Sequence, residues 1–153
     1  MIRVDSIEYE FVGLMPKKLC EGVLYISIEY ATAVHLCLCG CASRVVTPLS
    51  PAQWSVTFDG ETVSLSPSVG NHDLECASHY WIRKNQVRWS RPWSAEEIAK
   101  GRAADRRAIL DHFDDTRRDE RSNAPDEQAA ARGKTRRRRV RTFFGAFGRP
   151  GAN

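Results

Sequence analysis

The chain has 153 residues, of which 42% are hydrophobic and 27% charged. This composition fits one ordinary domain with a core, and the lack of any run of about 18 apolar residues excludes a membrane-spanning helix. The net charge of +4 is uneven, because residues 1–93 carry 8 Lys/Arg against 9 Asp/Glu and residues 94–153 carry 15 against 10. The first residues lack the apolar stretch of a secretory signal, so we expect a cytoplasmic protein with reduced thiols.

Short runs of β-branched and aromatic residues predict a series of strands before residue 94. They lie at Val23–Tyr30, Ala33–Leu38, Arg44–Thr47, Trp54–Phe58, Glu61–Leu65, His79–Arg83 and Gln86–Trp89. Asp59-Gly60 predicts a two-residue type I′ hairpin turn, and Lys84-Asn85 predicts a second hairpin. We expect Trp81 and Trp89 in the core, and Cys20 as a small core residue.

The pattern changes at Ser94, where Ser94-Ala-Glu-Glu97 has the sequence of a helix capping box. It predicts a helix from about Ala95 to about Arg118 with few apolar positions. The segment that follows is polar and then strongly basic, which predicts a disordered tail. The expected fold is therefore mainly β (α+β overall): a small antiparallel β-sheet domain over residues 1–93, a helical extension over 94–121 and a basic tail over 122–153.

Three cysteines fall within five residues, and a Cys-x-x-His segment follows later in the chain. Zinc sites with thiolate ligands draw close pairs of ligands from two such segments. The sequence therefore predicts a zinc knot, whose candidate ligands are Cys37, Cys39, Cys41, Cys76 and His79. Buried free cysteines without a metal remain the alternative.

The spacing of the first three cysteines limits how they can share a metal. In a straight strand Cys37 and Cys41 would be roughly 13 Å apart, too far for two sulfurs bound to one zinc ion. Either the chain bends at Gly40, which tolerates such a bend, or one cysteine is not a ligand. We favour Cys39, Cys41, Cys76 and His79, with Cys37 as the substitute or neighbour. Four protein ligands would make the site structural, whereas three and a water would make it potentially catalytic.

A second group of reactive residue types lies between the two cysteine segments. Ser66, Ser68 and His72 are candidate catalytic residues, because a serine nucleophile needs a base within hydrogen-bond reach. The same stretch is also typical of a Ser/Pro/Gly turn with polar side chains and no catalytic role.

Several motifs occur in a fixed order: His35-x-Cys-x-Cys-Gly-Cys41, Val45-Val-Thr-Pro-Leu-Ser-Pro51, Trp54, Leu65-Ser-Pro-Ser-Val-Gly-Asn71, Cys76-x-Ser-His-Tyr-Trp-Ile82 and Trp89. With these motifs the chain resembles a bacterial domain family of unknown function over roughly residues 23–89. The chain departs from the family pattern at Leu38 and Ala42, neither of which is a candidate ligand. Members of that family often lie beside genes for E1-like, E2-like and ubiquitin-like proteins in defence-type operons.

The resemblance implies a zinc-binding partner of a bacterial ubiquitin-like conjugation system of the antiphage defence type. It also implies a processing or deconjugating peptidase that uses Ser66 or Ser68 with a histidine. Two other functions stay open: a non-enzymatic, zinc-stabilised module that binds a ubiquitin-like, E1-like or E2-like protein, and a nonspecific nucleic-acid binder. The last would act through residues 132–141, which contain seven Lys/Arg. With Phe143, Phe144 and Phe147 the same run is also typical of a segment that binds an anionic membrane, and a solvated extension is as typical of the tail as these two functions together.

Overall fold

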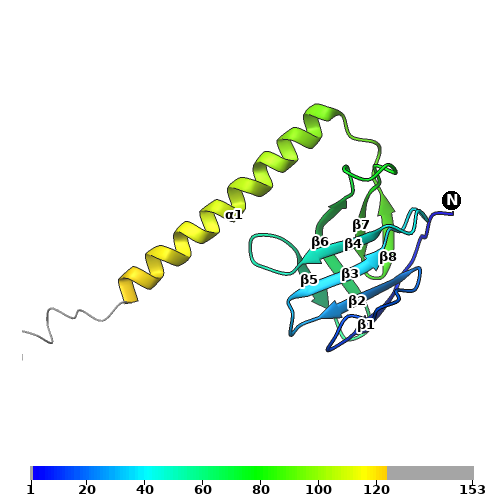
Figure 1. Ribbon diagram of the computed structural model, residues 1–153, viewed down its shortest axis with the longest axis horizontal. Coiled ribbons are helices and arrows are strands. Elements are labelled where there is room, and N and C mark those ends of the chain that lie inside the picture. The colour runs from blue at the N-terminus through cyan, green and yellow to red at the C-terminus, as the bar shows by residue number, and fades with distance from the viewer. Residues whose placement is uncertain (1, 124–153) are drawn as a thin grey trace, which may run out of the picture. The chain divides into compact units, whose positions relative to one another are not determined.

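The computed structural model describes residues 2–123 and contains eight strands and one helix in these residues (Figure 1). The strands are β1 (Glu8–Phe11), β2 (Val23–Ser27), β3 (Thr32–Leu36), β4 (Arg44–Pro48), β5 (Ser55–Phe58), β6 (Val63–Gly70), β7 (His79–Arg83) and β8 (Gln86–Trp89), and the helix is α1 (Ala95–Asn123). The mainly β fold with a C-terminal helix is confirmed. The predicted basic tail and its residues 132–141 lie outside the described residues.

The strands form two four-stranded sheets, ordered β1-β2-β3-β4 and β5-β6-β7-β8. All neighbouring strands are antiparallel except β1 and β2, which pair in parallel. The sequence did not reveal β1, because Glu-Tyr-Glu-Phe is short and half charged. Such a strand suits the edge of a sheet, where charged side chains face water.

One hydrophobic core joins the two sheets. Its buried side chains include Leu24 and Ile26 of β2 and Leu65, Tyr80 and Ile82 of the second sheet. Strand β2 is buried at all five positions, because its opposite face packs in a smaller cluster under the segment that precedes it.

Three local expectations were wrong. The loop between β5 and β6 has four residues, since Phe58 pairs with Val63 and only Gly60 has a positive φ. The Asp59 carboxylate stabilises this wider loop by accepting hydrogen bonds from the Glu61 and Thr62 amides. Cys20 is exposed, and Trp81 is only partly buried because it lies on the side of β7 away from the core.

The hairpin at Lys84-Asn85 and the start of α1 are confirmed. Lys84 and Asn85 have φ angles of 47° and 60°, as a type I′ turn requires. Ser94 Oγ accepts a hydrogen bond from the Glu97 amide, and Glu97 Oε2 accepts one from the Ser94 amide. Helix α1 extends five residues beyond the predicted end.

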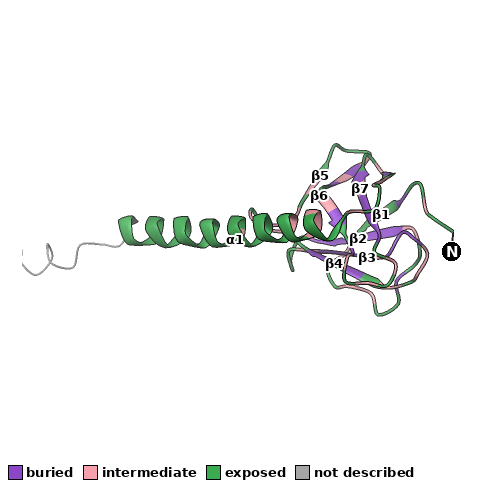
Figure 2. Cartoon of the chain, turned by 90° about the horizontal axis from the view of Figure 1, so that it is seen from above, coloured by how far each residue is buried: buried purple, intermediate pink, exposed green. Residues whose placement is uncertain are grey.

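Residues Met1–Asp115 form one compact unit that includes the β domain and most of α1. Nearly all side chains of α1 are exposed (Figure 2), with partial burial at positions such as Ile98, Gly101 and Ile109. No helix in residues 2–123 has both the length and the apolar character that crossing a membrane requires.

Candidate functional site

Four cysteines meet at one corner of the β domain. The Sγ atoms of Cys37, Cys39, Cys41 and Cys76 all lie within 4.8 Å of one another. The first three follow β3, and Cys76 lies in the turn that precedes β7. Two segments that are distant in sequence therefore converge, as the cysteine spacing predicts.

The chain bends sharply between Cys37 and Cys41. Strand β3 ends at Leu36, the Gly40 amide donates to the Cys37 carbonyl at 3.1 Å, and Gly40 has a φ of 85°. An added Cβ at Gly40 would lie 2.9 Å from the Ile2 carbonyl oxygen, so glycine is needed for both its conformation and its size. Of the two alternatives that the spacing left open, the structure shows the bend at Gly40, with all three cysteines in the cluster.

The sulfur positions fit a tetrahedral metal ion. Around a zinc ion with Zn–S bonds of about 2.3 Å, neighbouring sulfurs are about 3.8 Å apart. Cys37 Sγ lies 3.4 Å from Cys39 Sγ and 3.9 Å from Cys76 Sγ. The structure thus contains a four-cysteine cluster that could hold a metal ion. His79 is not in this cluster, and Cys37 completes it instead.

The cluster is continuous with a buried polar network. Cys37 Sγ lies 3.1 Å from Ser78 Oγ, and the Asn71 amide nitrogen donates to Cys37 Sγ, Ser78 Oγ and the Tyr80 hydroxyl at 3.0–3.4 Å. The Tyr80 hydroxyl also lies 2.8 Å from His35 Nε2. This network fixes the residues on both sides of His79.

The thiols have different protonation properties in the absence of a metal. Burial, followed by the hydrogen bond with Cys37, raises the pKa of Cys39 to about 12. Hydrogen bonds from the side chain and backbone of Ser43 lower the pKa of Cys41 to about 6.

A serine and a histidine face each other on the second sheet. Ser68 Oγ lies 2.9 Å from His79 Nε2, within the hydrogen-bond distance of a nucleophile and its base. His79 is 4% exposed. Burial, and then the electrostatic interaction with His72, lowers the pKa of His79, which favours the neutral imidazole, the form that can accept a proton.

A β-bulge brings Ser68 to His79. Leu65 pairs with Ile82 and Val69 with Tyr80, so four steps along β6 face two steps along β7. Bulges of this kind redirect side chains and are common beside active sites. Gly70 pairs with His79, and a Cβ added at Gly70 would lie 2.8 Å from His72 Nε2, so the absence of a side chain leaves room for the His72 ring beside the pair.

The Ser68–His79 pair lies in a cleft of about 410 Å³, a volume in the range of ligand sites. One wall comes from the β domain and the other from the first turns of α1. The lining residues include Trp54, Pro67, His72, Trp93, Ile98, Gly101, Arg102, Asp105 and Ile109.

The other predicted catalytic residues are placed differently. Ser66 is exposed, and within residues 2–123 no hydrogen bond joins its hydroxyl to a histidine. His72 lines the cleft, and its ring centroid lies 5.4 Å from that of His79. Sequence reasoning assigned His79 to the metal because of the Cys-x-x-His spacing. Its contact with Ser68 depends on the register between β6 and β7, which no local motif revealed.

The structure therefore defines a mainly β protein in which a serine and a histidine in hydrogen-bond contact lie in a cleft, together with a four-cysteine cluster. Comparison with protein families gives the more specific assignment. Residues 11–90, just over half of the chain, match the family described as "Bacterial ubiquitination-like system serine protease (BubE)". The chain belongs to this family. Neither a curated protein nor a solved structure matches it.

Proposed function

We propose that this chain is a zinc-stabilised serine peptidase that acts on ubiquitin-like proteins in a bacterial conjugation system. Ser68 is the nucleophile and His79 is the general base. The observation that carries the proposal is the 2.9 Å contact between Ser68 Oγ and His79 Nε2 in the cleft. The family name supports the serine protease chemistry and the type of pathway.

The proposed reaction needs only these two side chains and water. His79 Nε2 takes the hydroxyl proton as Ser68 Oγ attacks the scissile carbonyl, and then gives that proton to the departing amine. The resulting ester is hydrolysed when His79 accepts a proton from an attacking water and returns it to Ser68. A ubiquitin-like precursor or conjugate supplies the carbonyl group.

The proposed metal is zinc, held by Cys37, Cys39, Cys41 and Cys76. Four thiolate ligands leave no open position, so the ion supplies folding stability rather than chemistry. It would fix the turn before β7 and thereby the position of His79. Reduced thiols suit the cytoplasm, which we propose as the compartment, and the defence role belongs to the same proposal.

The direct test is labelling with a fluorophosphonate probe, followed by incubation with the cognate ubiquitin-like precursor. The wild-type chain should be labelled at Ser68 and should cleave the precursor. Ser68→Ala should lose both properties, whereas the matched Ser66→Ala should retain them. Equal labelling of Ser68→Ala and wild type would contradict the proposed nucleophile.

The non-enzymatic alternative has its own expected result. A stable complex with an E1-like or E2-like protein, together with no labelling of Ser68, would favour a binding module. Elemental analysis of the purified chain tests the metal, with one zinc ion per chain expected.

A further inference from the structure

The imidazole of His79 has a hydrogen-bond partner on only one side. For Nε2 to accept the Ser68 proton, the other ring nitrogen, Nδ1, must carry a hydrogen. In serine peptidases a carboxylate usually accepts that hydrogen and orients the ring. Here Nδ1 is buried, and nothing within residues 2–123 forms a hydrogen bond with it. Asp73, an acidic residue of the same cleft, is instead bound to Arg102 at 2.6 Å.

Aromatic rings surround His79 in place of a carboxylate. The indole of Trp93 is perpendicular to the imidazole, at a centroid distance of 4.3 Å and an interplanar angle of 87°. Trp81 lies at 5.1 Å. Trp93 also stacks with His72 at 5.5 Å. Of the three rings, Trp93 is the nearest to His79, and it contacts both histidines.

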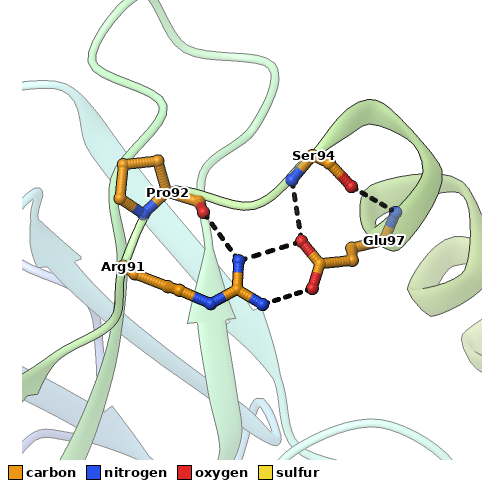
Figure 3. Close-up of polar contacts among 4 residues, drawn as sticks. All are labelled: Arg91, Pro92, Ser94 and Glu97. Carbon is orange, nitrogen blue, oxygen red and sulfur yellow. Dashed lines mark hydrogen bonds and ion pairs between the residues drawn. The ribbon is translucent and has the colours of Figure 1, made fainter.

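Helix α1 holds Trp93 against His79. A Cβ added at Gly101 would lie only 3.3 Å from Trp93 Cζ3, so the missing side chain lets the helix approach the indole. The segments that flank Trp93 are also fixed (Figure 3). The Arg91 guanidinium binds the Glu97 carboxylate and the Pro92 carbonyl, and Glu97 in turn caps the helix at Ser94.

We propose that Trp93 is the positioning residue of His79, and that α1 holds it in place. Edge-to-face packing of the indole replaces the third hydrogen-bonding member that serine peptidases usually have. This inference rests on the proposed function of the Ser68–His79 pair. It also extends beyond the family match, because Trp93 and α1 follow residue 90, where that match ends.

The charges around the pair agree with this role. His72 is the titratable group in ring contact with His79, and the opposite wall of the cleft brings Arg102 and Asp105, with Asp73 paired to Arg102. An indole covers the imidazole without adding charge and keeps it away from water, which favours the neutral ring. Removal of the indole should admit water and raise the pKa of His79 toward its ordinary value.

The experiment compares Trp93→Ala, Trp93→Phe and Gly101→Ala with wild type, using a small fluorophosphonate that does not fill the cleft. Trp93→Ala should lower the maximal rate of Ser68 modification by about 10–100-fold, as a small misplacement of a catalytic group does. The probe concentration that gives half of the maximal rate should change little. In Trp93→Ala the midpoint of the acidic limb of the pH–rate profile should move to higher pH. Trp93→Phe should restore most of the rate. Phe58→Ala, an exposed aromatic on β5, is the matched control and should behave as wild type.

Gly101→Ala tests the role of the helix. Alanine has the higher helix propensity by about 1 kcal/mol, so a purely structural effect would be neutral or favourable. We expect a severalfold loss of rate instead, because the methyl group presses on the indole. NMR titration of the His79 ring, with zinc content and circular dichroism as checks on folding, gives a readout without substrate.

The outcomes separate this inference from the proposed function. If wild-type Ser68 is not labelled at all, the proposed function is wrong. If wild type is labelled and Trp93→Ala keeps its rate and pH midpoint, the positioning role is wrong. Should Trp93→Ala lose its fold, Gly101→Ala decides the question, and an unchanged rate in that variant overturns the role of α1.

Discussion

One short segment, residues 71–79, contributes to two sites of different character, because Cys76 belongs to the cysteine cluster and His79 contacts Ser68. At the cysteine corner, the four Sγ atoms lie within 4.8 Å of one another. Asn71 and Ser78 add hydrogen bonds to Cys37 Sγ. At the serine corner, the His79 imidazole has one hydrogen bond within residues 2–123, and its buried Nδ1 has no partner there, as is also true of His35 Nδ1. The cysteine corner thus joins two distant segments of the backbone, whereas the serine corner presents a pair of side chains to a cleft.

The backbone builds the two corners in different ways. Residues with a positive φ, namely Gly40, Ala42 and Ala77, lie in the turns around the cysteines, and these turns bring the cysteines of two distant segments together. The second corner depends on the register between β6 and β7. If this comparison is correct, the first corner controls stability and the second controls activity.

The largest expected effect is that of Cys76→Ser on stability. Structural zinc contributes an apparent free energy of the order of 10 kcal/mol to the folding of small zinc domains. Loss of one ligand should therefore remove the metal and the cooperative thermal transition. Zinc analysis and calorimetry measure both. Cys20→Ser, which changes an exposed cysteine outside the cluster, should leave both unchanged.

The second prediction concerns the coupling of Ser68 and His79. Each of Ser68→Ala and His79→Ala should lower kcat by at least about 10³-fold, and the double variant should be no slower than either, because the two groups act as a unit. Kinetics on a cognate ubiquitin-like precursor measure this. Additive losses would show that the two residues act separately. Both single variants should keep their zinc.

The third prediction compares Gly40→Ala with Gly60→Ala, and both should have smaller effects than the variants above. Both glycines have a positive φ, but only at Gly40 would the new Cβ approach another backbone atom, the Ile2 carbonyl oxygen, at 2.9 Å. Gly60→Ala should lower the free energy of unfolding by about 1 kcal/mol, and Gly40→Ala by about 2–3 kcal/mol with weaker zinc binding. Equal losses in denaturant titrations would remove the special role of Gly40.

The smallest effect concerns pH. The pKa of His79 is lowered in the folded protein, so the acidic limb of kcat/KM should have its midpoint below the ordinary histidine value of about 6.5. The free energy of unfolding should depend on pH in the same direction, because the unfolded chain binds the His79 proton more readily than the folded protein does. The contribution of His79 to stability is therefore present above about pH 6.5 and is lost as the pH falls through the lowered pKa of the folded protein. His72→Gln should raise the midpoint slightly, because it removes the electrostatic interaction with His72 that helps to lower the pKa of His79. A midpoint above about 6.5 in the wild type would contradict the inference that burial lowers the pKa of His79.

Much of this protein could be predicted from short stretches of sequence. The capping box at Ser94 and the turn at Lys84-Asn85 depend on hydrogen bonds and φ angles of adjacent residues, so their sequences are sufficient. The spacing of the cysteines left two alternatives, a bend at Gly40 or a cysteine outside the cluster, and the structure shows the bend. Where a side chain changed the local geometry, as Asp59 did in the wider β5–β6 loop, the simple turn pattern gave the wrong answer.

By itself, the sequence determined the β-rich fold, the helix after Ser94 and the convergence of cysteines from two segments. Only the tertiary structure decided that Cys37, and not His79, completes the four-cysteine cluster. It also decided that His79 meets Ser68, and that Trp93 lies between this histidine and α1. The physical reason is that strand register and helix docking come from the packing of the whole core, to which residues far apart in the chain contribute together.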